Sequence, residues 1–235
     1  MKSGTFNRVL SLAQQTLSQQ IDKRLPEKLN LKRFAHPMAE KVAWAPLKPG
    51  GTNVRAEKAV QISAMEVIIK STFTVKAIAL LVFLLGLSML FLGVADMINP
   101  SQGILEFHGG FLMLISLLPL WAGNHLIKKV AKRSNFQREN SSFFQEKPER
   151  AFSIQKIKSS EVSLDNIVAI QLLREYIRSS EGKHFDSYEM NLVLDDGSRV
   201  NLMDHGDLRS IRSDAKMIAR FLSVPVWDGI RRGKK

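Results

Sequence analysis

The chain has 235 residues, of which 34 are Lys or Arg and 22 are Asp or Glu, so its formal net charge is +12. It contains no cysteine, which excludes a disulfide scaffold, a cysteine nucleophile and a thiolate zinc site. Its 45% hydrophobic and 24% charged residues match an average soluble protein, but both kinds are unevenly distributed along the chain.

The basic surplus lies on both sides of one segment without Lys or Arg. Residues 1–76 carry a net charge of +8, residues 77–127 carry −2, and residues 128–150 return to +4. The remaining residues, 151–235, are nearly balanced at +2. This distribution is typical of a membrane protein rather than of a nucleic-acid-binding protein.

The N-terminal part contains one helix candidate and a segment rich in turn residues. Residues 5–24 have apolar side chains at helical spacing, and this amphipathic helix either packs on the protein itself or lies on the inner leaflet. Residues 32–55 contain several prolines and a glycine pair, which predict an irregular tether leading toward the membrane. The pattern of residues 56–75 fits either a strand pair or a helix that approaches the membrane.

Two uncharged runs of nineteen residues follow, at 77–95 and 109–127. A helix of that length spans nearly the whole hydrocarbon core of a bilayer, which is about 30 Å thick. A signal peptide would lie within about the first 30 residues, so both runs are predicted to be transmembrane helices. Because the loop between them lacks Lys and Arg, the positive-inside rule places both termini in the cytoplasm.

Within the runs, two sets of residues are candidates for a specific role. Ala79, Gly86 and Gly93 recur every seven positions and form one face on which another helix can approach closely. That face can receive the second run, a second copy of the chain or another subunit. Asn124 and His125 are possible functional polar residues, because polar groups at membrane depth can mark a pathway.

The strongest signals of a folded domain come after a polar connector. β-Branched residues favour a strand from residue 166 onward. Alternating apolar residues over 188–204, around an Asp-Asp-Gly-Ser turn, predict a β-hairpin. Asp207 is placed to cap an amphipathic helix that ends at Val224-Pro225, after which a short tail packs.

This region contains the segments NIVAIQLLREYIR, YEMNLVLDDGSRVNLMDHGD and AKMIARFLSVPVWD. Together they look like the cytoplasmic domain of small bacterial inner-membrane proteins of unassigned function. Such proteins often pair two membrane helices with a pleckstrin-homology-like domain. The resemblance covers about residues 150–228 and implies a small, partly open β-barrel capped by the C-terminal helix.

The expected fold class is therefore a membrane α-helical hairpin plus an α+β cytoplasmic domain. The expected segments are a basic N-terminal segment, the two-helix hairpin, a polar connector, the pleckstrin-homology-like domain and a basic tail, at residues 1–76, 77–127, 128–149, 150–230 and 231–235.

No residue pattern predicts catalysis, a cofactor or a metal site. The histidines form no short ligand pair, and turn formation and helix capping account for the acidic residues around the hairpin, Asp195, Asp196, Asp204 and Asp207 with His205 between them. Lys156 and Lys158 are followed by an acidic stretch, which disfavours the headgroup site of lipid-binding pleckstrin-homology domains.

The sequence favours a non-enzymatic protein of the bacterial cytoplasmic (inner) membrane whose cytoplasmic domain binds a protein partner or regulates a membrane complex. The alternative is a module that binds or senses anionic lipid, and a membrane enzyme is the least favoured class. The expected partners are membrane lipids and a protein. The protein is either a different protein or a second copy of this chain bound through the membrane helices. No nucleic acid or small-molecule substrate is indicated.

The topology generates a first prediction. A reporter that works only in the cytoplasm should be active when it is fused after residue 60 or after residue 140. A reporter that works only on the outer side should be active when it is placed within residues 99–107. The reason is that basic residues flank the spans on one side. Cytoplasmic activity of the loop fusion would contradict the topology.

Overall fold

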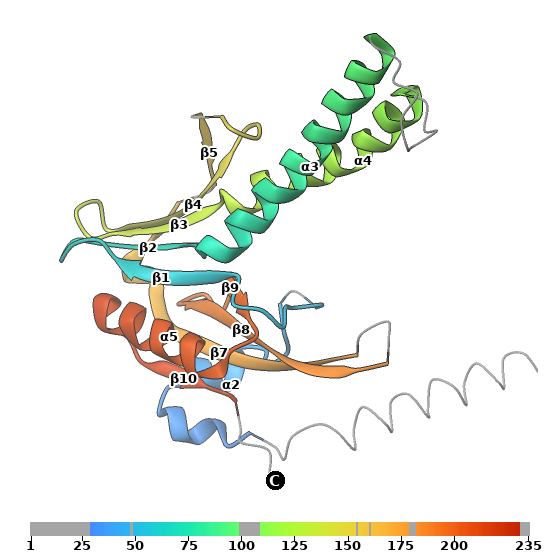
Figure 1. Ribbon diagram of the computed structural model, residues 1–235. Helices are drawn as coiled ribbons and strands as arrows, with labels where there is room; N and C mark the ends of the chain where they lie inside the picture. Colours follow the sequence, from blue (N-terminus) through green and yellow to red (C-terminus); the bar gives the residue numbers. More distant parts are fainter. Residues whose placement is uncertain are drawn as a thin grey trace, which may run out of the picture.

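The computed structural model describes residues 29–47, 49–98, 109–153, 155–159, 161–178 and 182–230. The amphipathic helix expected over residues 5–24 and the basic tail at 231–235 lie outside these residues. In the described part, two β-sheets and a C-terminal helix form a body from which two long helices project (Figure 1).

The first sheet, called sheet A, consists of six strands: β1 (Glu57–Gln61), β2 (Glu66–Ser71), β3 (Arg133–Gln137), β4 (Ser142–Pro148), β5 (Lys156–Lys158) and β6 (Val162–Ser163). The strand order is β1-β2-β3-β4-β5, with β6 also pairing with β4. All of these pairs are antiparallel.

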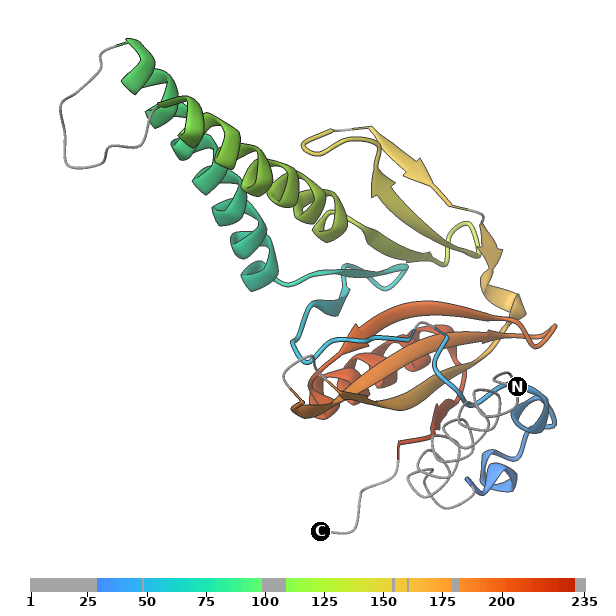
Figure 2. The same ribbon diagram turned by 90° about the vertical axis from the view of Figure 1, so that its right-hand side faces the viewer.

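Sheet A is interrupted in sequence by the helical hairpin. Helix α3 (Phe73–Ile98) follows β2, α4 (Gly109–Val130) precedes β3, and β2 pairs directly with β3 (Figure 2). Residues 56–75 thus form the strand pair β1–β2 and the first residues of α3. Residues 128–149, expected as a polar connector, contain the end of α4 and then β3 and β4.

Strands β3 and β4 lack the sequence pattern from which a strand is predicted. Strand β3 has a single large apolar side chain, Phe136, and the two phenylalanines of β4, Phe143 and Phe144, are adjacent. Neither strand therefore shows the alternation of apolar and polar residues that predicts a strand.

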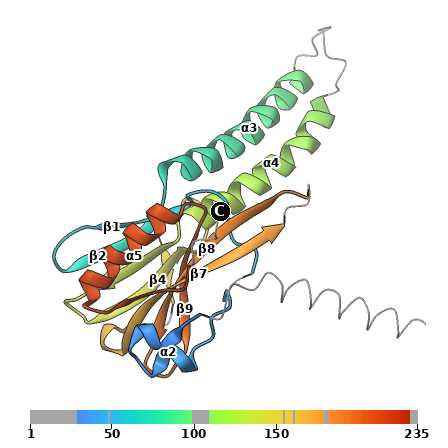
Figure 3. The ribbon, with the colours of Figure 1, turned by 90° about the horizontal axis from the view of Figure 1, so that it is seen from below.

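Helices α3 and α4 are long and apolar enough to cross a membrane. They run side by side along their length (Figure 3). Their buried residues all recur at seven-residue spacing: Ala79, Gly86 and Gly93 in α3, and Gly109, Ser116 and Gly123 in α4.

The two series of small residues face each other. A Cβ atom added to Gly86 would lie 2.6 Å from the backbone nitrogen of Leu120, and one added to Gly123 would lie 2.6 Å from the backbone of Phe83. From the sequence, the face formed by Ala79, Gly86 and Gly93 could receive the second helix, a second copy of the chain or another subunit. In the structure this face packs against α4, the second helix of the same chain.

The second sheet, called sheet B, consists of β7 (Ile167–Arg178), β8 (His184–Leu194), β9 (Arg199–His205) and β10 (Val226–Asp228). The order is β10-β7-β8-β9, with β10 parallel to β7 and the other pairs antiparallel. The predicted hairpin is confirmed as β8 and β9, and Gly197 in its turn has a φ of +83°, which glycine adopts without steric cost.

Helix α5 (Leu208–Leu222) follows β9, and its predicted cap is confirmed. The carboxylate of Asp207 accepts a hydrogen bond from the backbone N–H of Ser210 at 2.6 Å. The short tail after the helix forms β10, in which Trp227 is fully buried.

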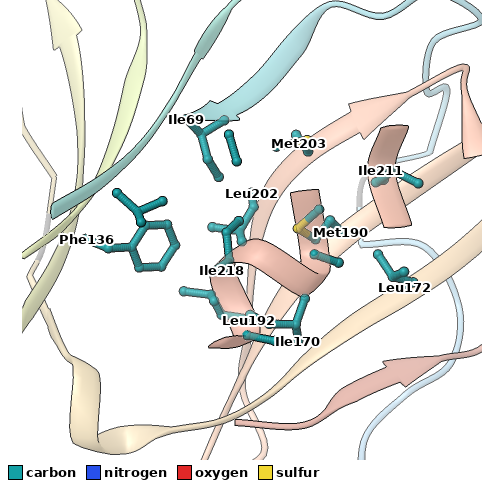
Figure 4. Packing of buried hydrophobic residues seen from close by; sticks show 14 of the residues in the cluster. Ile69, Phe136, Ile170, Leu172, Met190, Leu192, Leu202, Met203, Ile211 and Ile218 are labelled. Carbon is teal, nitrogen blue, oxygen red and sulfur yellow. The ribbon is translucent and has the colours of Figure 1, made fainter. Parts of the chain in front are cut away.

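The main hydrophobic core lies between the two sheets and α5 (Figure 4). Ile69 and Phe136 from sheet A pack with Leu172 and Leu192 from sheet B and with Ile218 from α5. Strands on both sides of the helical hairpin thus contribute to the same core as the C-terminal strands.

The expected small barrel is not closed, because the described strands form two separate sheets. At the edge of sheet A, the backbone N–H of Ala59 in β1 donates to the carboxylate of Asp214 on α5 at 3.2 Å. Burial raises the pKa of Asp214, and the hydrogen bond from Ala59 acts in the opposite direction. The carboxylate of Asp214 thus satisfies a backbone N–H group with which a further strand would otherwise pair.

The other face of sheet B is covered by the N-terminal segment. After η1 (Leu31–Phe34) comes the short helix α2 (Met38–Lys41). Ala39 of this helix and Val42, which follows it, pack against Ala169, Val193 and Trp227. This second apolar cluster holds the start of the described chain on the domain.

The residues that follow α2 form a strap, defined as residues 42–47 and 49–54, along sheet B. The backbone N–H of Leu47 donates to both carboxylate oxygens of Glu189, at 2.7 and 2.9 Å, and Gly50 and Gly51 donate to Glu175. The segment expected as an irregular tether, residues 32–55, instead contains most of η1 and all of α2, and only the strap that follows them is irregular. The strap is bound to the domain. Its amide groups are recognised by carboxylates about 125 to 140 residues away in the sequence, which no local pattern reveals.

The helix seam generates a second prediction. Replacing Gly86 by Leu should lower the thermal unfolding midpoint of the full-length protein in a mild detergent by about 5 °C or more, because the side chain must displace the backbone of α4. The matched control is Gly110→Leu, since a Cβ atom at Gly110 meets nothing within 4 Å. Equal midpoints for the two variants would show that the seam does not depend on close approach.

Candidate functional site: a cationic surface at the base of the hairpin

One row of residues crosses sheet A where the sheet joins the two long helices. Successive strand registers align Lys58 with Lys70, Lys70 with Arg133, Arg133 with Glu146, and Glu146 with Lys158. Residues directly opposite each other in antiparallel strands point to the same face. The row therefore places four cations and one carboxylate on the outer face of sheet A, away from the core.

The like charges in this row are unfavourable for the sheet alone. Lys58, Lys70 and Arg133 are three consecutive cations on neighbouring strands, and directly opposed like charges destabilise a sheet. The one carboxylate of the row, Glu146, forms an ion pair with Lys156 at 3.0 Å. An arrangement that costs stability in isolation is typical of a surface that binds an anion.

The first turn of α3 adds a further cation to the row. The charges of Arg133, Lys70 and Lys58 each repel the ammonium group of Lys76. Lys76 on α3 thus lies near the three cations that strand pairing aligns on β1, β2 and β3. We call these four residues the basal cluster. The end of α4 contributes Lys128 and Lys129 nearby in the chain.

A buried polar group lies one step further along the same face. The side-chain nitrogen of Asn135, which is opposite Ile68 and Phe144, has no hydrogen-bond partner among the described residues. The ammonium group of Lys158 lies 3.8 Å from the centre of the Phe144 ring. The outer face thus combines cations with an unused hydrogen-bond donor.

Sequence reasoning found part of this site. It used the basic segments on both sides of the two apolar runs, which include Lys70, Lys76 and Arg133, to orient the runs, but it did not connect these residues with Lys58. Only the strand register brings these residues together, and no sequence signal gives that register in advance.

The polar residues noted in the second span lie elsewhere. Asn124 and His125 are exposed on the surface of α4 that faces away from α3, and the ring of His125 stacks on Trp121 at a centroid distance of 6.0 Å. They do not line an interior path between the two helices.

A second group of basic residues surrounds an open pocket between α5 and the turns of sheet A. Arg138 donates from Nε to the carbonyl of Phe221 at 3.1 Å and lies over the Phe221 ring, so it caps the last turn of α5. Lys216 and Arg220 line the same pocket from the exposed side of the helix. Helix capping accounts for Arg138 without a ligand.

The residues around the β8–β9 hairpin have structural roles. Asp196 accepts the Ser198 N–H in the turn, and His205 is buried, with its Nδ1 accepting the N–H of Asp207 at 2.8 Å. The described residues contain no group of three or more His, Asp or Glu side chains that could hold a metal ion.

Comparisons with known proteins add no assignment. No protein-family model matches this chain, and neither a curated protein nor a solved structure shows detectable similarity to it.

The environment of His205 generates a third prediction. Burial lowers the pKa of His205, the nearby charge of Arg55 lowers it further, and Asp207 acts in the opposite direction. The unfolded chain therefore binds this proton more readily, so the folded state should lose stability as the pH falls below about 6.5, by at most about 1.4 kcal/mol per pH unit. Protonation of Nδ1 would also remove the acceptor for the Asp207 N–H.

Thermal unfolding of the full-length protein in neutral detergent between pH 7.5 and 5 measures this loss. The variant His205→Asn keeps an acceptor but does not titrate, so its midpoint should change less over the same range. An identical pH dependence in both proteins would exclude His205 as the cause.

Proposed function

We propose that this chain is a non-enzymatic integral membrane protein that binds anionic phospholipid headgroups through the basal cluster. In this proposal α3 and α4 span the bacterial inner membrane as a hairpin, with both termini in the cytoplasm. The α+β domain then lies against the inner leaflet, at the level where sheet A joins the helices.

The surface of the hairpin supports the spanning assignment. Leu81, Phe91 and Leu114 expose 64%, 71% and 69% of their surfaces, although they lie in the middle of long helices. A helix in the core of a soluble protein would bury such side chains, and a signal sequence would lie much closer to the N-terminus than residue 73. A bilayer covers this apolar surface and leaves only the small-residue seam for contact between the helices.

The observation that carries the headgroup assignment is the cross-strand row of like charges in the basal cluster. Anionic headgroups lie at the depth at which α3 begins and α4 ends, and each Lys or Arg near such a surface contributes about 1 kcal/mol. A phosphate placed between Lys70 and Arg133 would also offset the repulsion that the sheet otherwise bears.

The resemblance to pleckstrin-homology-like proteins is part of this proposal. Two packed sheets with α5 over the core support it, although the strands do not close into a barrel. The proposed lipid surface differs from the headgroup site of such domains, because it lies on strands that flank the membrane helices.

A specific feature also favours binding of a protein partner by the cytoplasmic domain. Strands β7 and β8 extend as a two-stranded arm beyond the residues that pair with β9 and β10. At its end Tyr176 is half exposed and stacks on His184 at a centroid distance of 4.8 Å. The strap bonds to Glu175 and Ser187 at the base of this arm and leaves its tip exposed. An exposed aromatic tip is typical of a protein contact.

The fourth prediction tests the lipid assignment with the variant Lys70→Glu. In the full-length protein in neutral detergent, this change should leave the thermal unfolding midpoint equal or higher, because the new carboxylate would lie between Lys58 and Arg133. Added phosphatidylglycerol should raise the midpoint of the original protein more than phosphatidylcholine with the same acyl chains. The variant should lose at least half of that difference.

The matched control is Lys216→Glu, which makes the same change of charge at an exposed position of α5 that lines the pocket with Arg138 and is not part of the cross-strand row. It should retain the full response to phosphatidylglycerol. Equal stabilisation of the original protein by the two lipids, or an unchanged response in Lys70→Glu, would overturn the headgroup assignment.

A further inference from the structure

The connection between β4 and β5 lies beside the helical hairpin. The two strands rise from sheet A along the flank of the long helices (Figures 1 and 2). In the turn that joins them, the ring of Phe152 meets the ring of Phe83 on α3 edge to face, with 5.2 Å between centroids. A residue of the α+β domain thus contacts an apolar helix well beyond its first turn.

The depth of this contact follows from the register of the two helices. Phe83 is level with Gly123, whose added Cβ would lie 2.6 Å from the Phe83 backbone. Gly123 precedes Lys128 by five residues, which at 1.5 Å per residue is about 7 to 8 Å along the helix. Apolar faces of interfacial helices lie about 5 to 10 Å deep, at the boundary between headgroups and acyl chains.

The conformation of Phe152 keeps its ring at the surface. Its φ is +62°, in the left-handed region that bulky residues rarely adopt, at a cost on the order of 1 kcal/mol. Despite the contact with Phe83, 63% of its surface is exposed. This backbone conformation is unfavourable, and it places an apolar ring at the surface. Contact of the ring with water does not offset that cost, whereas an apolar environment does.

The residues around Phe152 match a membrane interface. Arg150 precedes it in the same turn, directly after Glu149. Lys147 and Lys156 lie on the two strands that the turn joins, with Lys156 paired to Glu146. Ile157 on β5 is also half exposed. An exposed apolar tip flanked by cations is the pattern of segments that lie in the interface of an anionic leaflet.

We propose that residues 150–153 of the β4–β5 turn insert into the cytoplasmic leaflet, with Phe152 among the upper acyl-chain carbons and Arg150 at the phosphate level. The ligand of this site is phospholipid. Together with the basal cluster, the turn gives the domain a second contact with the bilayer and restrains its rotation about the hairpin axis. This inference rests on the proposal that α3 and α4 span the membrane.

The absence of cysteine permits a direct test by single-cysteine labelling. The full-length variant Ser153→Cys, labelled with a polarity-sensitive fluorophore and reconstituted in vesicles of phosphatidylethanolamine and phosphatidylglycerol, should show blue-shifted emission. Lipids with a nitroxide near the top of the acyl chain should quench it at least two-fold. The control Asn140→Cys, in the exposed β3–β4 turn of the same sheet, should emit as in water.

A third probe, Leu114→Cys on the exposed surface of α4, separates the two proposals. An aqueous signal from Leu114→Cys would overturn the spanning assignment itself. An apolar signal there, combined with an aqueous signal from Ser153→Cys, would overturn only the insertion of the turn.

The variant Phe152→Gly distinguishes a membrane contact from a structural role. Glycine adopts a positive φ freely, so the fold should be retained or stabilised when only the ring is removed. In the background of Ser153→Cys this change should abolish most of the quenching. Quenching that persists without the ring would show that Phe152 does not anchor the turn.

Discussion

The pairing of β2 with β3 is the constraint on which the rest of the structure depends. The helical hairpin is inserted between two strands that lie about 4.8 Å apart, so its two helices leave the sheet at closely spaced points. Helices with ordinary side chains at their contact pack about 8 to 10 Å apart. The small residues Gly86 and Gly123 let α3 and α4 approach each other more closely than that. The spacing of the helices is thereby closer to the spacing of the strands. The same continuity of strand and helix links the orientation of sheet A to that of the hairpin.

This continuity explains why charge gathers at one level of the molecule. In the proposed topology, β2 ends and β3 begins in the headgroup region, where basic residues are favoured on the cytoplasmic side. Strand pairing then turns residues from separate flanks, such as Lys70 and Arg133, into direct neighbours. Repulsion between them is tolerable where anions are abundant. The charge of the basal cluster and the apolar turn at Phe152 would thus serve one purpose, which is to hold the domain against the bilayer.

Sheet B has a different requirement, since polar groups are buried on the face covered by the strap. Gln171, Glu189 and Asn191 are nearly inaccessible, and buried polar side chains are costly without partners. The strap supplies backbone groups for two of them: Leu47 donates to Glu189, and the carbonyl of Ala43 accepts from Gln171. Asn191 donates to Glu189. An irregular segment suits this task, because backbone groups that are not used in a helix or sheet are available for side chains. The strap is thereby part of the domain rather than a connection to it.

The sequence by itself determined the features that depend on neighbouring residues. The two apolar helices, the turn at Gly197, the cap at Asp207 and the seven-residue seam all follow from local composition, spacing and backbone preference. Strands β1 to β4, the basal cluster and the contact of Phe152 with Phe83 were decided only by the tertiary structure. Lys58 and Arg133 are separated by two membrane-length helices in the chain, and the register that aligns them comes from packing a shared core. Long-range pairing of this kind leaves no local trace in the sequence, because the partners of β2 residues, such as Arg133 opposite Lys70, lie beyond the whole helical hairpin.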